Sequence, residues 1–552
     1  MAHGSLADLL RRIDRGGYGQ YRRLSGTWEL DRIGIEVQRV QADPFAPPSR
    51  IRVTVPAEVA DLSPELWRGK ARATALASYL VRRLAANLRG GAFRVDAGGQ
   101  EVLARSSSEV ADGVVHFRIG IQLPGKGRTI DGVTAHRLLC EQLPQAVRKA
   151  LDFRYETARE FVETIEDSAA LRDKLPELGL VAFVADSALL PRRSGIDDRP
   201  LESGGISFRS PESLAAKVEL PNRGTVSGMG IPEGVTLIVG GGFHGKSTLL
   251  RAIERGIYDH VPGDGRELVV ARTDTAKIRA EDGRGVERVD VRPFVGELPT
   301  GSDTGDFSTE NASGSTSQAA SIIEAVEAGA HTLLVDEDTA ATNLMIRDAR
   351  MQALVGKSSE PLTPFVDLVR PLHAEHQVST IIVMGGSGDY LDIADRVLML
   401  DSYIASEVTE QARAIAATPT GRAVEASTFG PIRHRSPEPG SVDARGKNGR
   451  TRIRNRGTDT LLLGESEIDL RALDQIVDPS QVTGIGLAIE KLARSGALTD
   501  TIAAALTHYA AELADVPALA AGSTDDFVVP RALDIAAALN RLRTLRIRDL
   551  KS

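Results

Sequence analysis

Apolar and polar residues recur along this chain with the spacings of strands and helices, and the pattern divides the chain into three parts. In the first part, apolar residues alternate at 34–40 and 50–55, as in strands, and recur every four residues within 72–88, as on one face of a helix. This mixture predicts an N-terminal α+β accessory domain over residues 1–200.

The second part contains short, continuous apolar runs with the length of buried strands. These runs lie at 235–239, 332–335 and 379–384, and residues 319–329 have the spacing of an amphipathic helix. We therefore predict an α/β nucleotide-binding core over residues 201–405.

The third part, residues 406–552, changes character along its length. Residues 417–449 are dense in proline, glycine, serine and arginine and have no apolar period, which is typical of a linker or of a segment that orders on binding. Helices are predicted downstream at 480–495, 499–513 and 530–543. The prediction for this part is a mixed, helix-rich C-terminal domain.

Composition bounds the class of protein. A chain of 552 residues exceeds the size of one hydrophobic core, so two or three domains are expected. No apolar run approaches the ~20 residues that span a bilayer, and the first residues lack the apolar core of a signal peptide. We expect a cytoplasmic protein with no membrane partner. The single cysteine, Cys140, excludes an intramolecular disulfide and a cysteine-based zinc site.

The segment that follows the apolar run at 235–239 fits the pattern G-x-x-x-x-G-K-S. In this pattern glycines let backbone N–H groups face a phosphate, the lysine reaches the β and γ oxygens, and the serine ligates Mg²⁺. A chance glycine-rich turn is the alternative, but a predicted strand precedes the segment and a predicted helix follows it. We predict that ATP and Mg²⁺ bind to Gly240, Gly241, Gly242, Phe243, His244, Gly245, Lys246, Ser247 and Thr248, with Ser247 as a metal ligand and Lys246 as a catalytic residue.

A second apolar run, at 332–335, ends in consecutive acids. A carboxylate at the end of a strand can hold Mg²⁺ through water, and a second carboxylate beside it can polarise the attacking water. These roles predict Asp336 on the metal side and Glu337 as the catalytic base. An acidic junction between a strand and a loop, with no ligand, is the alternative.

The start of the helix predicted around 319–329 carries a further motif. Ser313, Gly314 and Ser315, after Ala312, resemble the Leu-Ser-Gly-Gly-Gln segment of ATP-binding-cassette (ABC) ATPases, and residues 336–343 are similar to their Walker B and D-loop. The resemblance implies a P-loop NTPase core of ABC type and a homodimer that sandwiches two nucleotides. Ser313, Gly314 and Ser315 of one copy would then contact the γ-phosphate bound to the other. A serine-rich helix cap without a ligand is the alternative.

Other segments resemble a narrower family, the soluble predicted ABC-class ATPases that include an RNA-binding component of kinetoplastid mitochondrial RNA editing. The resembling segments are QADPFAPPSR at 41–50, LPGKGR at 123–128, VAFVAD at 181–186, LPRRSG at 190–195, KIRAEDGR at 277–284, GGSGDY at 385–390 and PRAL at 530–533.

The chain departs from transport ABC ATPases at three places. GGSGD at 385–389 stands where their switch histidine is expected, and Ser387 or the backbone N–H groups there are candidates for contact with the γ-phosphate. No clear Q-loop glutamine is present, and Glu281 or Asp282 is the candidate substitute. Asn343 replaces the usual final aspartate of the D-loop. We therefore expect slow turnover.

Basic residues form candidate sites for nucleic acid, although the net charge is −8. Arg450, Arg452, Arg454 and Arg456 alternate, so a strand would place these phosphate-binding side chains on one face. Lys126 and Arg128 lie on a glycine-rich turn, and a further candidate set comprises Tyr18, Tyr21, Arg22 and Arg23. The scarcity of aromatic residues near the arginines favours contact with the backbone of a duplex over base stacking. A solvated edge strand, a hairpin tip and a packed N-terminal segment are the alternatives.

The leading hypothesis is an ABC-class ATPase that couples ATP hydrolysis in a homodimer to binding of nucleic acid, with RNA favoured over DNA. The alternative is an ATP-dependent switch that remodels or recruits proteins without nucleic acid. A small-molecule phosphotransferase and a transporter subunit with a separate membrane partner are disfavoured, the first by the Ser313–Gly314 and D-loop motifs.

Overall fold

The computed structural model describes residues 5–88, 90–299 and 301–548. The chain forms two compact units, of which the first comprises residues up to 166 together with 515–529, and the second comprises 167–514 and the residues from 530 on. The functional boundaries proposed after residues 200 and 405 stay predictions.

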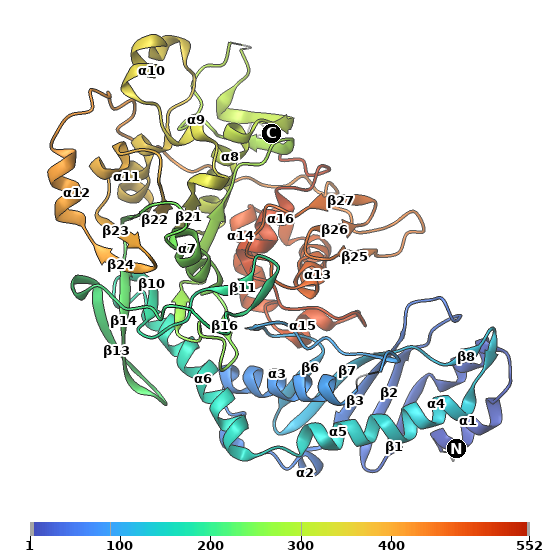
Figure 1. Ribbon diagram of the computed structural model, residues 1–552. Helices are drawn as coiled ribbons and strands as arrows, with labels where there is room; N and C mark the ends of the chain where they lie inside the picture. Colours follow the sequence, from blue (N-terminus) through green and yellow to red (C-terminus); the bar gives the residue numbers. More distant parts are fainter. Residues whose placement is uncertain (1–4, 89, 300, 549–552) are drawn as a thin grey trace. The chain divides into compact units, whose positions relative to one another are not determined.

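The first unit is built on an antiparallel sheet, drawn in blue in Figure 1. The strand order is β1 (Gly26–Leu30), β2 (Ile33–Arg39), β3 (Ser49–Val55), β7 (Val114–Ile121) and β4 (Phe93–Arg94), and β6 (Ser108–Ala111) also pairs with β7. Burial alternates along β3, because successive side chains point to opposite faces. Helix α3 (Lys70–Asn87) buries Leu76, Leu80 and Leu84, as its four-residue period predicts.

A segment from near the C-terminus completes this unit. It contains α15 (Val516–Ala520) and the fully buried Phe527, and its Asp526 forms an ion pair of 2.6 Å with Arg50 on β3. The N–H of Ser106 also donates to the carbonyl of Phe527 at 2.9 Å. Nothing in the periodicity of residues 515–529 indicates that they pack with the first part of the chain.

The second unit contains the nucleotide-binding core predicted from the apolar runs. Its main sheet has the order β18 (Thr275–Ile278), β21 (Thr332–Asp336), β22 (Ser379–Val383), β15 (Val235–Val239), β23 (Arg396–Asp401) and β24 (Ile404–Glu407). All neighbours are parallel except β23 and β24. The carboxyl ends of the parallel strands therefore meet along one edge of the sheet, where ligands bind in open α/β folds.

Three helices follow strands of this sheet and cover it: α7 (Lys246–Arg255), α8 (Gly314–Glu327) and α11 (Phe365–His376). A second, antiparallel sheet has the order β13 (Ala215–Leu220), β14 (Gly224–Pro232), β10 (Leu180–Ala185) and β17 (Val269–Ala271). No helix of the described residues combines the length and apolarity that crossing a membrane requires.

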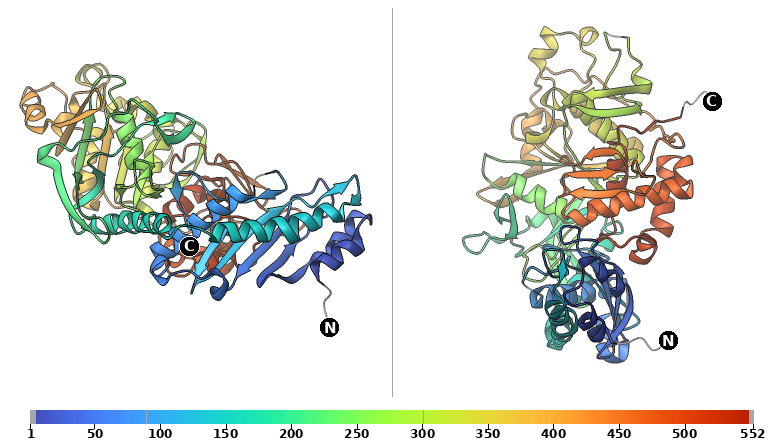
Figure 2. Two further views of the ribbon diagram at one scale, coloured as in Figure 1. Left: turned by 60° about the horizontal axis from the view of Figure 1, so that its bottom comes forward. Right: turned by 90° about the vertical axis from the view of Figure 1, so that its right-hand side faces the viewer.

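The C-terminal part of the second unit contains the three predicted helices. They are α13 (Pro479–Ser495), α14 (Ile502–Glu512) and α16 (Ala532–Leu539), and α13 packs beside the sheet β25 (Ile453–Arg456), β26 (Thr460–Leu463) and β27 (Ser466–Asp469), as Figure 2 shows. Helix α16 is shorter than the predicted 530–543. Pro530 precedes the helix because its carbonyl accepts a 2.7 Å hydrogen bond from the buried Tyr509 hydroxyl.

The segment at 417–449 has irregular backbone, as its composition predicts, but it is not a free linker. Arg422 forms an ion pair with the buried Asp367, and Arg433 one of 2.9 Å with Asp306. Arg435 is 2% exposed and lies 2.6 Å from the Glu327 carboxylate of α8. Buried ion pairs, which hydrophobic periodicity cannot reveal, hold this segment against the core.

Replacing Arg435 with Met is expected to destabilise the second unit, because Glu327 would stay buried without its partner. Removing one partner of a buried ion pair costs about 3–5 kcal/mol. Urea denaturation followed by circular dichroism should show this loss, and the double variant Arg435→Met/Glu327→Leu should recover most of it. Arg445→Met, at an exposed pair with Asp443, is the matched control and should change stability little. An equal effect of the two single variants would contradict the prediction.

Candidate functional site

The loop between β15 and α7 fits only glycine at two positions. Gly240 has a φ of +141°, and a side chain there would overlap the carbonyl oxygen of Leu400 on the neighbouring strand β23. Gly245 has a φ of +100°, and a Cβ atom there would lie 2.8 Å from the Tyr403 ring. The loop is thus pressed against the β23–β24 hairpin, which explains why these glycines are needed.

Lys246 starts α7 and turns back over the loop. Its Nζ donates to the carbonyls of Gly240 at 2.6 Å and Gly241 at 2.8 Å, which holds the ammonium group at the end of β15. The N-cap of α7, Gly245, offers no side-chain oxygen to the N–H groups of the first turn, where Ser247 and Thr248 lie. These N–H groups and the helix dipole can therefore serve an anion.

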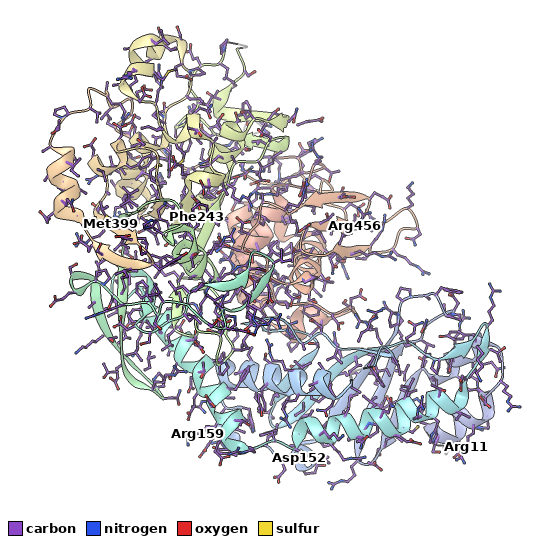
Figure 3. The ribbon with its side chains drawn as sticks, in the orientation of Figure 1. Arg11, Asp152, Arg159, Phe243, Met399 and Arg456 are labelled. Carbon is purple, nitrogen blue, oxygen red and sulfur yellow. The ribbon has the colours of Figure 1, made fainter. Side chains whose placement is uncertain are left out.

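The remaining loop residues predicted to bind ATP are on the surface. Gly241, Gly242 and Phe243 are exposed, and Phe243 is fully exposed with a φ of 65° (Figure 3). His244 connects the loop to the turn that follows β23, since its Nδ1 accepts a 2.9 Å hydrogen bond from the N–H of Ser402.

Asp336 and Glu337 lie at the adjacent strand end, as predicted. Asp336 is buried, and its Oδ1 accepts from the N–H of Asp338 at 3.2 Å. Glu337 extends from the end of β21 across the end of β22, where its Oε2 accepts from the N–H groups of Gly385 at 2.6 Å and Gly386 at 2.9 Å. Its carboxylate is therefore oriented by two backbone donors.

Gly385 and Gly386 are the site residues whose part the sequence did not reveal. A Cβ atom on Gly385 would lie 3.9 Å from Lys246 Nζ, and a Cβ atom on Gly386 would overlap Glu337 Oε1. Lys246, Glu337 and the Gly385–Gly386 turn thus converge. GGSGD was noted as the segment that replaces a switch histidine, but only the strand order shows that its first two residues hold Glu337. The predicted contact between Ser387 and a phosphate stays a prediction; its hydroxyl hydrogen-bonds to Asp389 at 3.2 Å.

Ser313 caps α8 as the motif predicts. Its exposed hydroxyl accepts from the N–H of Thr316 at 3.4 Å, and Gly314 and the buried Ser315 continue into the helix. Among the described residues, the printed partners of the Ser313 side chain all belong to its own helix. Its hydroxyl and the N-terminus of α8 thus face outward from this copy of the chain.

The loops around the site are joined to one another by hydrogen bonds. The buried Gln318 of α8 accepts from the N–H of Ala341 at 2.7 Å, in the D-loop-like segment. The N–H of Glu281, after β18, donates to Ser317 Oγ at 2.8 Å. Its carboxylate is paired with Arg541, so Glu281 does not point into the site; Asp282, near Gly314, remains the candidate at the Q-loop position.

Two titratable groups beside the site are perturbed by burial. Burial raises the pKa of Tyr390, whose hydroxyl donates to the carbonyl of Met345 at 2.8 Å. Burial lowers the pKa of Lys277 on β18, while the negative charges of Glu254 and Asp336 act in the opposite direction.

The donor set for a metal consists of oxygen atoms. Among the described residues, no three His, Cys, Asp or Glu side chains gather to hold a metal by themselves. The Ser247 hydroxyl and the Asp336 carboxylate are hard oxygen ligands of the kind that Mg²⁺ takes, together with phosphate oxygens and water. The residues present therefore fit a Mg²⁺ ion that arrives with a nucleotide.

The arginines proposed for nucleic acid lie as the alternation predicts. Arg450, Arg452, Arg454 and Arg456 are all exposed, and the other face of β25 packs on α13. Arg452 pairs with Glu465 at 3.3 Å and Arg456 with Glu467 at 3.1 Å, whereas Arg450 and Arg454 have no ion pair within the residues that the structure describes. Figure 3 marks Arg456 on this sheet.

In the first unit, Lys126 and Arg128 are exposed on the hairpin of β8 (Gly125–Lys126) and β9 (Thr129–Ile130). Tyr18 and Tyr21 are buried, with their hydroxyl groups bonded to the carbonyls of Leu123 and Pro124. The alternative of a packed segment is therefore correct for these two tyrosines, which cannot stack on bases.

Three family models match successive parts of the chain. The P-loop domain of ABC_ATPase matches residues 154–435, ABC_N, the N-terminal region of ATPases of the ABC class, matches 3–154, and the MRB1590 C-terminal domain matches 452–548. The uncharacterized protein MJ1628 of Methanocaldococcus jannaschii is 29% identical over 277 residues, which cover 48% of this chain and 59% of that protein. The match thus spans well under two thirds of this relative.

Solved structures with a similar fold include ATP-binding cassettes. The cassette MJ1267 of an ABC transporter, in an ADP conformation, has a TM-score of 0.26 and 12% identity, and the match covers 44% of this chain and 96% of that chain. The protein cbiO1 from Clostridium perfringens, part of the ABC transporter complex cbiONQ, has a TM-score of 0.24 and 16% identity, with 41% and 87% covered.

Proposed function

The chain belongs to the ABC_ATPase family, whose P-loop domain covers residues 154–435, and on this premise we propose that it hydrolyses ATP at the loop formed by residues 240–247. The observation that carries the proposal is the position of Glu337. Its carboxylate is fixed by Gly385 and Gly386 beside Lys246, at the sheet edge where the phosphates of a nucleotide would lie. A base held in this way is suited to accept a proton from an attacking water.

Each residue at the sheet edge has a part in this reaction. Lys246 and the N–H groups of the loop and of α7 bind the β- and γ-phosphates and stabilise the charge that develops on them. Ser247 and Asp336 hold Mg²⁺, which neutralises phosphate charge when bound. Glu337 Oε1 is free of the two backbone hydrogen bonds, which both go to Oε2, and is the atom that accepts the proton of water. The products are ADP and phosphate.

We propose a homodimer because Ser313 and Gly314 have no ligand in their own copy. The outward-facing N-terminus of α8 is an anion site in search of a phosphate, and a second copy supplies one across a two-fold interface. ATP would then join the two copies, and hydrolysis would release them.

The nucleic-acid part of the proposal depends on the exposed face of β25. Arg450 and Arg454 are free of ion pairs among the described residues, and the forks of exposed arginines suit phosphate oxygens. Lys126 and Arg128 are a second basic site, on the first unit. The resemblance to ATPases of RNA editing favours RNA. A protein-remodelling switch is the alternative, and the pairing of Arg452 and Arg456 with glutamates favours it.

Replacing Glu337 with Gln is expected to lower ATP hydrolysis about 100-fold or more, because a general base contributes roughly 10²–10⁴-fold. ATP binding should persist, and ATP-saturated protein should be dimeric by light scattering. Asp338→Asn, at the exposed neighbouring acid, is the matched control and should retain turnover. Unchanged turnover in the Gln variant would remove Glu337 from the mechanism, and a monomer under saturating ATP would contradict the sandwich.

Replacing Gly386 with Ala should reduce turnover by about 100-fold, the effect of a misplacement of roughly 1 Å. The added methyl group overlaps Glu337 Oε1, and the flexible carboxylate must move away. Gly386 has no positive φ, so the backbone accepts alanine and the unfolding temperature should hold. Gly388→Ala is the matched control, since no atom lies within 4 Å of its added methyl group. Steady-state phosphate release measures both, and equal rates would contradict the assignment.

Changing Arg450, Arg452, Arg454 and Arg456 together to Ala should weaken RNA binding and flatten its dependence on salt. Each phosphate contact that is lost reduces the slope of log K against log salt by about 0.7–0.9. A control with the same change in charge removes four other exposed arginines, Arg148, Arg159, Arg413 and Arg494. Mobility shifts with duplex and single-stranded RNA and DNA at several salt concentrations measure the effect. Equal losses in the two variants, or no binding by the unmodified protein, would favour the protein-remodelling alternative.

A further inference from the structure

The turn between β23 and β24 has an unusual backbone for its sequence. Ser402 has a φ of 51° and Tyr403 a φ of 69°, so both central residues lie in the left-handed region. Two-residue hairpin turns of this kind normally carry asparagine, aspartate or glycine there, because a bulky side chain is disfavoured. A tyrosine held in this conformation therefore suggests a function for its side chain.

The same turn is fastened to the P-loop. The N–H of Ser402 donates to His244 Nδ1 at 2.9 Å, and the N–H of Tyr403 donates to the carbonyl of His244 at 3.1 Å. The Tyr403 ring lies against Gly245, where an added Cβ atom would be 2.8 Å from its Cδ1. These contacts fix the aromatic ring at the start of α7.

The ring is nevertheless open to solvent. Tyr403 is 48% exposed, and its hydroxyl has no hydrogen-bond partner among the described residues. The nearby Ile404 is 61% exposed, and Met399, labelled in Figure 3, is 37% exposed on β23. An aromatic face beside a phosphate-binding loop is thus left without a covering group.

The strand order determines which end of a nucleotide would reach this ring. Glu337 and Gly385 lie at the ends of β21 and β22, on one side of β15, whereas Tyr403 lies at the end of β23, on the other side. Hydrolysis requires the terminal phosphate near Glu337. The nucleoside at the opposite end of the molecule must therefore extend toward β23 and its turn.

We propose that the Tyr403 ring is the surface on which the base of the bound nucleotide stacks. The inference rests on the proposed function, because it uses Glu337 to orient the nucleotide. Every base has a π face, so stacking alone gives affinity without selecting a base. The neighbouring exposed side chains, Met399 and Ile404, offer no hydrogen-bond donors for base recognition. The site should accept ADP and GDP with similar affinity.

The test compares a complete nucleotide with the phosphate chain alone. Calorimetry with Mg²⁺ measures the binding of ADP, GDP and inorganic tripolyphosphate to the full chain and to Tyr403→Gly, Tyr403→Phe and, as the matched control, Ile404→Ala. Loss of one stacked base should weaken ADP and GDP about tenfold in the Gly variant and leave tripolyphosphate unchanged. The Phe and Ile404→Ala variants should bind all three ligands like the unmodified protein.

The Gly variant also separates a binding role from a structural one. Glycine suits the positive φ, so the unfolding temperature of the variant should hold or rise while its affinity for ADP falls. Equal weakening of ADP and tripolyphosphate would mean that Tyr403 only shapes the loop, and unchanged ADP binding would assign the exposed ring to another contact; either result overturns the proposal. If the unmodified protein binds neither ADP nor tripolyphosphate, the proposed function itself fails.

A direct measurement of proximity uses Tyr403→Trp. The two native tryptophans, Trp28 and Trp67, belong to the first unit and provide the background through the unmodified protein. ADP should change the emission of the new tryptophan, and tripolyphosphate should change it much less. Identical responses to the two ligands would show that the base does not reach this position.

Discussion

The site depends on the contact between the Glu337 carboxylate and the turn at Gly385 and Gly386. Strands β21 and β22 pair in parallel with Asp336 opposite Val383, so the residues just beyond them emerge side by side. Two backbone N–H groups hold one carboxylate oxygen, and the missing side chain of Gly386 leaves room for the other. A carboxylate positioned by backbone is less mobile than one positioned by a flexible partner, and no histidine is needed to orient it.

The loops that border this contact form one connected set. Ala280 donates to the carbonyl of Thr339 at 2.9 Å, Gln318 holds the N–H of Ala341, and Ser317 holds the N–H of Glu281. Arg541, beyond α16, is paired with Glu281 and so ties the C-terminal segment to the same set. Such contiguity is the structural requirement for movements at the nucleotide to reach the sheet that carries the exposed arginines.

Charge illustrates the limit of counting residues. The sequence shows a run of arginines between 430 and 456, but their environments differ. Arg433 and Arg435 are consumed by Asp306 and Glu327, and Arg452 and Arg456 by glutamates on the neighbouring turn and strand. The acids that neutralise Arg433 and Arg435 lie more than one hundred residues away in the sequence. Only folding brings such partners together, so local composition overstates the basic surface available to a ligand.

The sequence by itself determined the elements whose signals are local. The apolar run at 235–239 forms β15 with the same bounds, Ser313 caps α8, and the glycines at 240 and 245 lie in the turn that their spacing predicts, because strand burial, helix capping and loop conformation depend on neighbouring residues. Tertiary structure decided which distant segments meet. The support of Glu337 by Gly385 and Gly386, the place of Tyr403 beside Gly245, the burial of Tyr18 and Tyr21, and the packing of residues 515–529 in the first unit all depend on strand order and on contacts across the chain, which no local periodicity encodes.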